Sequence, residues 1–266
     1  MLRALLTGFF FFTMTPLLIG AQWLLGILGL PGWGFIGNRY YRVLVHVLGI
    51  RVRVVGELVR DRAVLLVSNH VSWADILVIG SIAPVAFISK SEIAKWPLVG
   101  LAAKLQRSVF VDRSKRHQTG DAISEIVKRL AGGTPIVLFA EGTSSDGNHV
   151  LPFRSALIGA VKEAGSRSES GILIQPMSVA YTGINGVPMG RQYRPLIAWY
   201  GDLDFMPHIK TLMNTGAVDA VVTFGEPLMA DGSTDRKAMA KTLEGTIRTI
   251  TATTLRGRTW PAPAAS

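Results

Sequence analysis

The sequence predicts an α/β domain with a mostly parallel sheet flanked by helices, preceded by membrane helices at the N-terminus. From Arg51 onward, short β-branched runs alternate with helix-like stretches, which is the pattern of parallel strands joined by helices. Before that point, the 35 residues between Arg3 and Arg39 contain no charged side chain. No linker or change of composition divides the rest of the chain, and its 266 residues suffice for one self-sustaining core.

Seven segments are candidate strands, and one further segment is a clear amphipathic helix. We expect strands at residues 51–55, 64–67, 85–89, 108–111, 135–139, 172–181 and 218–224. We expect a helix over residues 121–131, because its apolar residues share one face and Gly132-Gly133 follows it. The chain is therefore divided into membrane-anchoring helices at 1–45, the α/β domain at 46–258 and a disordered tail at 259–266.

The uncharged N-terminal run is longer than one membrane span, which needs about 20 apolar residues. Pro16, Gly20, Pro31 and Gly32 interrupt the run, which predicts two short helices that dip into a bilayer. The arginines before and after it would then lie on one side of the membrane, which is the cytoplasmic side by the positive-inside tendency. The alternative is a cleaved signal peptide, but a single leading arginine and so long an apolar run fit that pattern poorly.

Charge and composition restrict the partners and the chemistry. Lys and Arg number 28 against 18 Asp and Glu, which gives a net charge of +10 and favours an anionic partner. The basic residues are scattered without interleaved aromatic residues, so we expect no nucleic-acid binding. The absence of cysteine excludes disulfides, thiolate nucleophiles and cysteine-based zinc sites. The sequence also contains no phosphate-binding glycine loop and no serine-hydrolase elbow.

Polar residues follow three of the predicted strands, at the point where each strand ends. The first of these strands leads into the segment from Ser68 to Asp75, the second into Asp112-Arg113, and the third into Glu141-Gly142-Thr143. Because ligands bind beyond the carboxyl ends of strands in open α/β sheets, we expect these residues to meet at one edge.

Each group has a functional and a structural interpretation. His70 and Asp75 can touch only if His70 lies in the turn before a helix and Asp75 in its first turn. One imidazole nitrogen would then serve as a base, although Asp75 could instead simply stabilise the helix N-terminus. Glu141-Gly142-Thr143 is either a turn that approaches a ligand or an ordinary turn. Arg113 and Arg154 are either anion ligands or surface charges.

Four blocks follow one another along the chain: Asn69-His70 through Asp75, Phe110 to Arg113, Phe139 to Thr143, and Gln175 to Ala180. Taken in this order, they resemble the four blocks of the lysophospholipid acyltransferases, a family that includes the bacterial 1-acyl-sn-glycerol-3-phosphate acyltransferases. The resemblance covers about residues 64–180, and the ordered set is far more specific than any one block.

The resemblance implies a mechanism and a set of site residues. His70 is the expected general base for the acceptor hydroxyl, which attacks an acyl thioester directly, and Asp75 orients it. No metal or cofactor is implied, and the acyl group comes from acyl carrier protein or CoA. The expected acceptor-site residues are Asn69, Arg113, Glu141, Gly142, Thr143, Ser144 and Arg154. The catalytic domain would face the cytoplasm from the inner membrane.

The acceptor is expected to be lysophosphatidate, which would be converted to phosphatidic acid in phospholipid biosynthesis. One departure favours an alternative, because the family's third block usually continues Glu-Gly-Thr-Arg and Ser144 replaces that arginine. Residues 141–148, 151–157 and 199–202 also resemble the lyso-ornithine lipid acyltransferases, whose acceptor carries no phosphate. A third possibility, of another class, is a non-catalytic membrane lipid-binding protein, which predicts normal function when His70 is removed.

Overall fold

The computed structural model describes residues 2–29, 32–60, 62, 64–96, 99–111, 118–156, 158–159, 172–231 and 233–260. The strands are β1 (Ile50–Val55), β2 (Val64–Ser68), β3 (Ala86–Lys90), β4 (Val109–Val111), β5 (Ile136–Phe139), β6 (Ile172–Ile184), β7 (Val187–Pro188), β8 (Val218–Phe224) and β9 (Leu228–Ala230). The α-helices are α1 (Leu2–Ile27), α2 (Trp33–Val47), α3 (Ala74–Ile82), α4 (Val99–Leu105), α5 (Gln118–Ala131), α7 (Phe205–Asn214) and α8 (Arg236–Leu255). The 3-10 helices among the described residues are η1 (Ser91–Lys95) and η2 (Arg194–Leu196).

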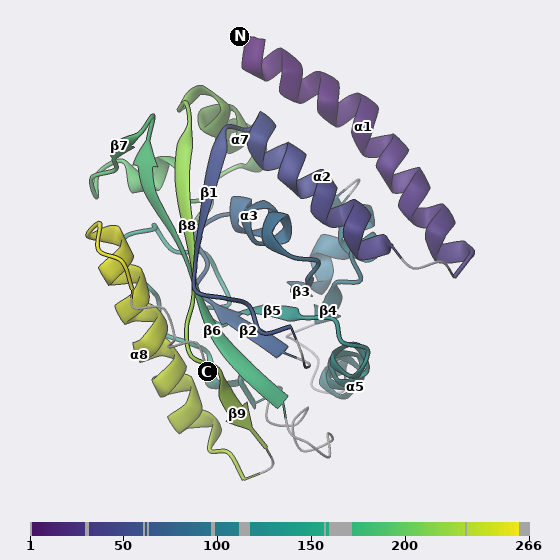
Figure 1. Ribbon diagram of the computed structural model, residues 1–266, viewed down its shortest axis with the longest axis vertical. Helices are drawn as coiled ribbons and strands as arrows, with labels where there is room; N and C mark the ends of the chain where they lie inside the picture. Colours follow the sequence, from purple (N-terminus) through teal and green to yellow (C-terminus); the bar gives the residue numbers. More distant parts are fainter. Residues whose placement is uncertain are drawn as a thin grey trace.

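These strands form one sheet with helices on both of its faces (Figure 1). Its order is β1-β8-β6-β2-β5-β3-β4, and β7 and β9 pair with β6. Neighbouring strands are parallel except where β6 pairs with β7, β8 and β9. The expected α/β class with a mostly parallel sheet is therefore confirmed.

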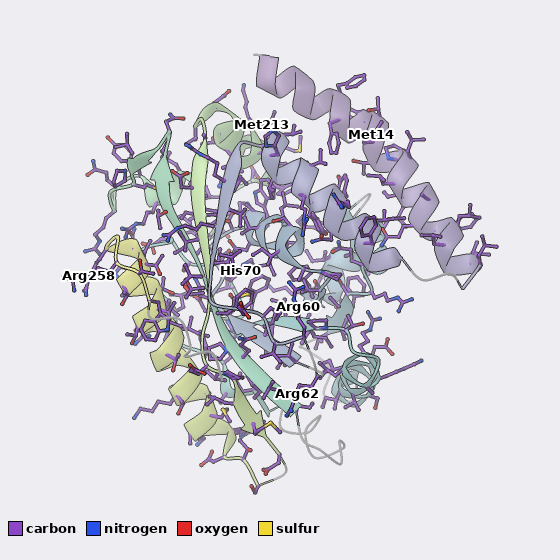
Figure 2. The ribbon with its side chains drawn as sticks, in the orientation of Figure 1. Met14, Arg60, Arg62, His70, Met213 and Arg258 are labelled. Carbon is purple, nitrogen blue, oxygen red and sulfur yellow. The ribbon has the colours of Figure 1, made fainter. Side chains whose placement is uncertain are left out.

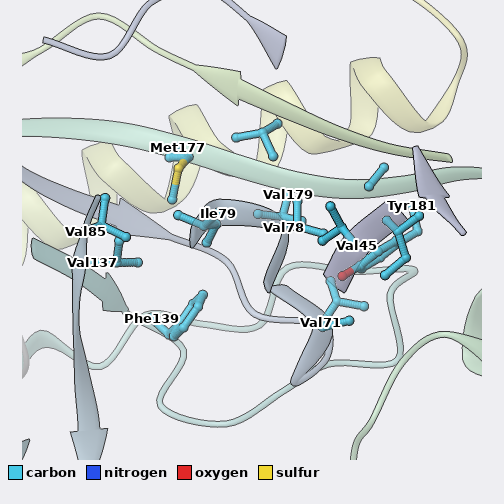
Figure 3. Close-up of a cluster of buried hydrophobic side chains, with 14 of the residues drawn as sticks. Val45, Val71, Val78, Ile79, Val85, Val137, Phe139, Met177, Val179 and Tyr181 are labelled. Carbon is cyan, nitrogen blue, oxygen red and sulfur yellow. The ribbon is translucent and has the colours of Figure 1, made fainter. Parts of the chain in front are cut away.

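Alternating side chains of the central strands build two hydrophobic cores. On β2, Val64 and Leu66 enter the core that α2, α3 and α7 cover, whereas Leu65 and Val67 enter the core under α5 and α8. Figure 3 shows the first core between β6 and α3. Because β2 is buried on both faces, its apolar run is continuous, as is typical of a central parallel strand. The sheet thus holds the end of β2 in a fixed place.

All seven predicted strands are present, with ends that differ by at most three residues. The predicted helix at 121–131 corresponds to α5, which begins three residues earlier. The short strands β7 and β9 were not predicted, because two or three residues are too few to show a periodic pattern. Residues 261–266 of the predicted tail lie outside the described residues.

The first part of the N-terminal run forms one long helix, α1, which ends at Ile27. Helix α1 continues through Pro16 and Gly20, so the expectation that these residues interrupt it was wrong. A proline inside a helix removes one backbone donor and crowds the carbonyl four residues earlier, which can bend a helix without ending it. By length and composition alone, the segment Gly8–Ile27 is sufficient to cross a membrane.

Helix α2 packs on the domain, because its apolar face contributes Tyr41, Leu44 and Val45 to buried positions. Its polar side chains also hold the end of α3, since Asn38 donates to the Gly80 carbonyl at 2.8 Å and Arg42 to the Ser81 carbonyl at 2.9 Å. The packed core thus begins before residue 46.

Candidate functional site

His70 and Asp75 lie together at the carboxyl end of β2, where the chain turns into α3. The Nδ1 atom of His70 is 2.8 Å from Oδ2 of Asp75. His70 stands in the turn and Asp75 in the first turn of α3, which is the arrangement that their five-residue spacing requires for contact. Figure 2 shows His70 near the middle of the molecule.

The hydrogen bonds of Asp75 define the tautomer of His70. Besides the imidazole, Oδ2 accepts the backbone N–H groups of Val71 at 2.7 Å and Ser72 at 3.0 Å. An oxygen that already accepts two backbone N–H groups carries no proton of its own. The proton between the two side chains therefore lies on Nδ1 of His70. The Nε2 atom then carries a lone pair, which is what a general base needs.

An aromatic stack supports the imidazole ring of His70. The ring lies against Phe139, at the end of β5, with centroids 4.0 Å apart and planes 19° apart. Phe139 stacks in turn on Phe87 of β3. The His70 side chain is 18% exposed, whereas that of Asp75 is fully buried, so solvent reaches the imidazole but not the carboxylate behind it.

Glu141 joins the two loops that frame His70. Its Oε1 atom accepts the His70 backbone N–H at 2.8 Å, and Oε2 accepts the Leu151 N–H at 2.9 Å. The carboxyl group is buried, and burial raises its pKa to about 8. The Ser145 N–H also donates to the His70 carbonyl at 2.8 Å. Glu141 therefore holds the backbone of the loop that carries His70.

Two more of the expected acceptor-site residues make structural hydrogen bonds. The Asn69 amide pairs with the backbone of Val179, donating to its carbonyl and accepting from its N–H, each at 2.9 Å. The Ser144 hydroxyl donates to the Trp199 carbonyl. These contacts tie the loop after β2 to β6 and the loop after β5 to the segment after η2.

The remaining expected residues differ in how they are placed. Gly142 is buried with φ of 73°, a left-handed conformation that favours glycine in this turn, and Thr143 beside it is exposed. Arg154 is exposed, and its backbone N–H bonds to the Ala140 carbonyl at 2.9 Å, which keeps it beside the same turn. Arg113 lies outside the described residues.

The structure adds contacts that the motifs did not indicate. Tyr181, from β6, donates its hydroxyl to Oδ1 of Asp75 at 2.8 Å. Trp73, three residues after His70, donates its indole N–H to Nδ1 of His208 on α7 at 2.9 Å. In each of these two pairs the residues are more than 100 positions apart in the sequence, so no local pattern could reveal the contact. The only signal in the sequence was a polar side chain within an apolar strand, for Tyr181, or within a helix, for His208. Among the described residues, no group of three or more His, Asp or Glu could hold a metal ion.

Known proteins resemble this chain in sequence and in fold. Residues 51–180 match the acyltransferase family. The chain is 46% identical to a lyso-ornithine lipid O-acyltransferase of Brucella abortus over 228 residues, which cover 84% of each protein. It is 42% identical to a lyso-ornithine lipid O-acyltransferase of Rhizobium meliloti, over 99% of this chain and 93% of that protein. The crystal structure of the 1-acyl-sn-glycerophosphate acyltransferase PlsC from Thermotoga maritima has the same fold, with a TM-score of 0.63 over 98% of both chains at 22% identity.

The buried Glu141 predicts a pH dependence of stability. Its pKa is about 8 in the folded protein against an ordinary value of 4.5, so the folded state binds this proton more tightly. The free energy of unfolding should therefore fall as the pH rises from about 4.5 to about 8. Glu141→Gln should flatten this part of the profile and lower stability by about 1–3 kcal/mol, because an amide cannot accept both N–H groups.

The measurement is denaturant unfolding at a series of pH values. Glu125→Gln is the control, because the Glu125 side chain is 42% exposed and should leave the profile unchanged. A wild-type profile that is as flat as that of Glu141→Gln between pH 4.5 and 8 would contradict this account of Glu141.

Proposed function

We propose which acceptor this chain uses and by what mechanism it acts. The chain belongs to the acyltransferase family, and its activity is acyl transfer. It transfers a fatty acyl group from an acyl thioester to the free hydroxyl of lyso-ornithine lipid, with His70 as the general base. The observation that carries the mechanism is the pair formed by His70 and the buried Asp75, with Nδ1 and Oδ2 2.8 Å apart.

The first step forms the bond between acceptor and acyl group. An alcohol is a poor nucleophile at neutral pH, so Nε2 of His70 takes the hydroxyl proton as the oxygen attacks the thioester carbonyl carbon. The imidazolium that forms is stabilised by the carboxylate of Asp75, which holds the proton on Nδ1. Since the Asp75 side chain is fully buried, its carboxylate is screened less than one in water would be.

The second step releases the carrier. The tetrahedral intermediate collapses, the carbon–sulfur bond breaks and the thiolate leaves. The proton on Nε2 of His70 passes to the sulfur, which returns the histidine to its starting state. The acyl group goes directly from sulfur to oxygen, and each proton is accounted for without an acyl-enzyme.

Two observations support lyso-ornithine lipid as the acceptor. Both relatives compared above at more than 40% identity carry that name. Ser144 stands where the family's third block usually has an arginine, and its hydroxyl is bonded to the backbone of Trp199. An acceptor without phosphate does not need a guanidinium at this position. We therefore rank lyso-ornithine lipid ahead of lysophosphatidate, which the sequence motifs alone had put first.

The donor and the location belong to the same proposal. The donor is a thioester of acyl carrier protein or CoA, and the net charge of +10 favours either anionic carrier. Helix α1 anchors the protein to the cytoplasmic membrane, with the catalytic domain on the cytoplasmic side. This anchor lets an acceptor react while its acyl chain stays in the bilayer. Exposed apolar residues along α1, such as Phe12, Leu17 and Trp23, support it.

Removing the proposed base tests the mechanism. His70→Ala should lower kcat by about 10²–10⁴-fold and leave binding of the lysolipid largely intact, because only proton transfer is lost. The assay offers lyso-ornithine lipid or lysophosphatidate with labelled acyl carrier protein or acyl-CoA to membranes from an expressing host. His46→Ala, at an exposed position on α2, is the matched control. Equal product from wild type and His70→Ala would refute the catalytic role.

Ser144→Arg tests the choice of acceptor. A guanidinium at this position should raise turnover of lysophosphatidate by about tenfold, because a charged hydrogen bond to phosphate becomes available. Turnover of lyso-ornithine lipid should not rise. Thr242→Arg, on the exposed face of α8, adds the same charge as a control. If Ser144→Arg changes neither turnover, position 144 does not select the acceptor.

A single fluorescent label tests the membrane anchor. The chain has no cysteine, so Phe12→Cys, at a position that is 77% exposed, offers one labelling site on α1. In vesicles that contain brominated lipids, a fluorophore at this site should be strongly quenched, since the site lies among acyl chains. The same label on Thr242→Cys should be quenched little. Equal quenching at the two sites would contradict anchoring by α1.

A further inference from the structure

We infer that Tyr181 is a positioning residue of the catalytic pair, and that its hydroxyl sets the basicity of His70 by holding Asp75. This inference rests on the proposed role of His70 as general base. It extends the pair to a chain of three side chains, Tyr181, Asp75 and His70, that come from β6, α3 and the loop before α3.

The length of β6 brings Tyr181 to this place. The pairing of β2 with β6 ends where Ser68 faces Met177, but β6 continues to Ile184. Side chains alternate along a strand, so Met177, Val179 and Tyr181 all enter the core beneath α3. Figure 3 shows these three side chains in a row along β6. Tyr181 therefore lies four residues beyond Met177, the last residue of β6 that pairs with β2, and it reaches the N-terminus of α3.

The Tyr181 hydroxyl completes the hydrogen bonding of a buried charge. Oδ2 of Asp75 accepts from the imidazole of His70 and from two backbone N–H groups, and Oδ1 accepts from Tyr181 at 2.8 Å. An ionised carboxylate offers about four acceptor positions. Of these four donors, Tyr181 is the one that comes from outside residues 70–72. A fully buried carboxylate needs such partners to stay ionised.

The same hydrogen bond should control how strongly Asp75 attracts the proton on His70. A donor at Oδ1 draws negative charge away from Oδ2, the atom that faces His70. Without the hydroxyl, more charge would remain on Oδ2 and the imidazolium would be favoured. Tyr181 itself remains a neutral donor, because burial and the adjacent Asp75 raise the pKa of its phenol well above the usual value.

Other titratable groups approach the three side chains from neighbouring elements. Glu141 accepts the His70 backbone N–H, and Arg248 of α8 interacts with Glu141. His208 of α7 accepts a hydrogen bond from Trp73, and burial lowers its pKa. These groups are present in the wild type and in the variants alike. A difference between the pH profile of the wild-type enzyme and that of a variant therefore isolates the effect of the Tyr181 hydroxyl.

The test compares two substitutions that each remove one buried hydroxyl. Tyr181→Phe removes the donor to Asp75, and Tyr41→Phe removes the hydroxyl of a buried tyrosine that packs on Gly80 of the same helix. The measured quantity is kcat/KM against pH, whose acidic limb reports the pKa of the base in the free enzyme. We expect this limb to move up by about 0.5–1 pH unit in Tyr181→Phe and to stay in place in Tyr41→Phe.

An unmoved limb in Tyr181→Phe would overturn the inference, whether the plateau falls or not, since a purely structural role lowers activity at every pH. A second variant covers the case in which Tyr181→Phe does not fold. Replacement of Tyr181 by 3-fluorotyrosine keeps the shape and makes the phenol a stronger donor, so the limb should move down. A limb that stays in place or moves up with 3-fluorotyrosine would equally overturn the inference.

The proposed function and the role of Tyr181 would be refuted by different results. If His70→Ala retains activity, the proposed function is wrong. If His70→Ala is inactive but neither change at Tyr181 moves the limb, only the role of Tyr181 is wrong.

Discussion

The fully buried carboxylate of Asp75 is the constraint on which the site depends. A charge without access to water must be matched by donors, and Asp75 obtains them from the loop after β2 and from β6. Two of these donors are backbone N–H groups, so the charge also determines the shape of the loop. Because His70 belongs to that loop, the carboxylate that would support the proposed base also holds the His70 side chain in place.

The sheet explains why these donors can meet. Parallel pairing brings the ends of β2 and β5 to one edge, where Phe139 supports the imidazole ring and Glu141 binds the backbone of the next loop. Strand β6 extends past that edge and reaches α3 with Tyr181. Asn69, Glu141 and Ser144 thus bond to backbone atoms of neighbouring segments. Such contacts keep the base still, which reduces the reorganisation that proton transfer requires.

Much of the fold could be predicted, because apolar periodicity and strand-end residues are local signals. The contact between His70 and Asp75 was also within reach, since five residues across a turn permit only one arrangement that joins them. The structural bonds of Asn69 and Ser144 were not, because their partners Val179 and Trp199 are distant in the sequence. The continuity of α1 through Pro16 was missed for a different reason: a proline inside a helix can bend the helix without ending it, and α1 continues past Pro16.

The sequence by itself determined the α/β class, the order of the strands along the chain and the residues that end the strands beside the site. These features follow from side-chain periodicity and from residue types a few positions apart. Only the tertiary structure decided that Tyr181 completes the partners of Asp75, that Glu141 joins two loops and that α2 packs on α3. Each of these depends on pairing register and on how far an element extends beyond its neighbour, and neither is recorded in any local stretch of residues.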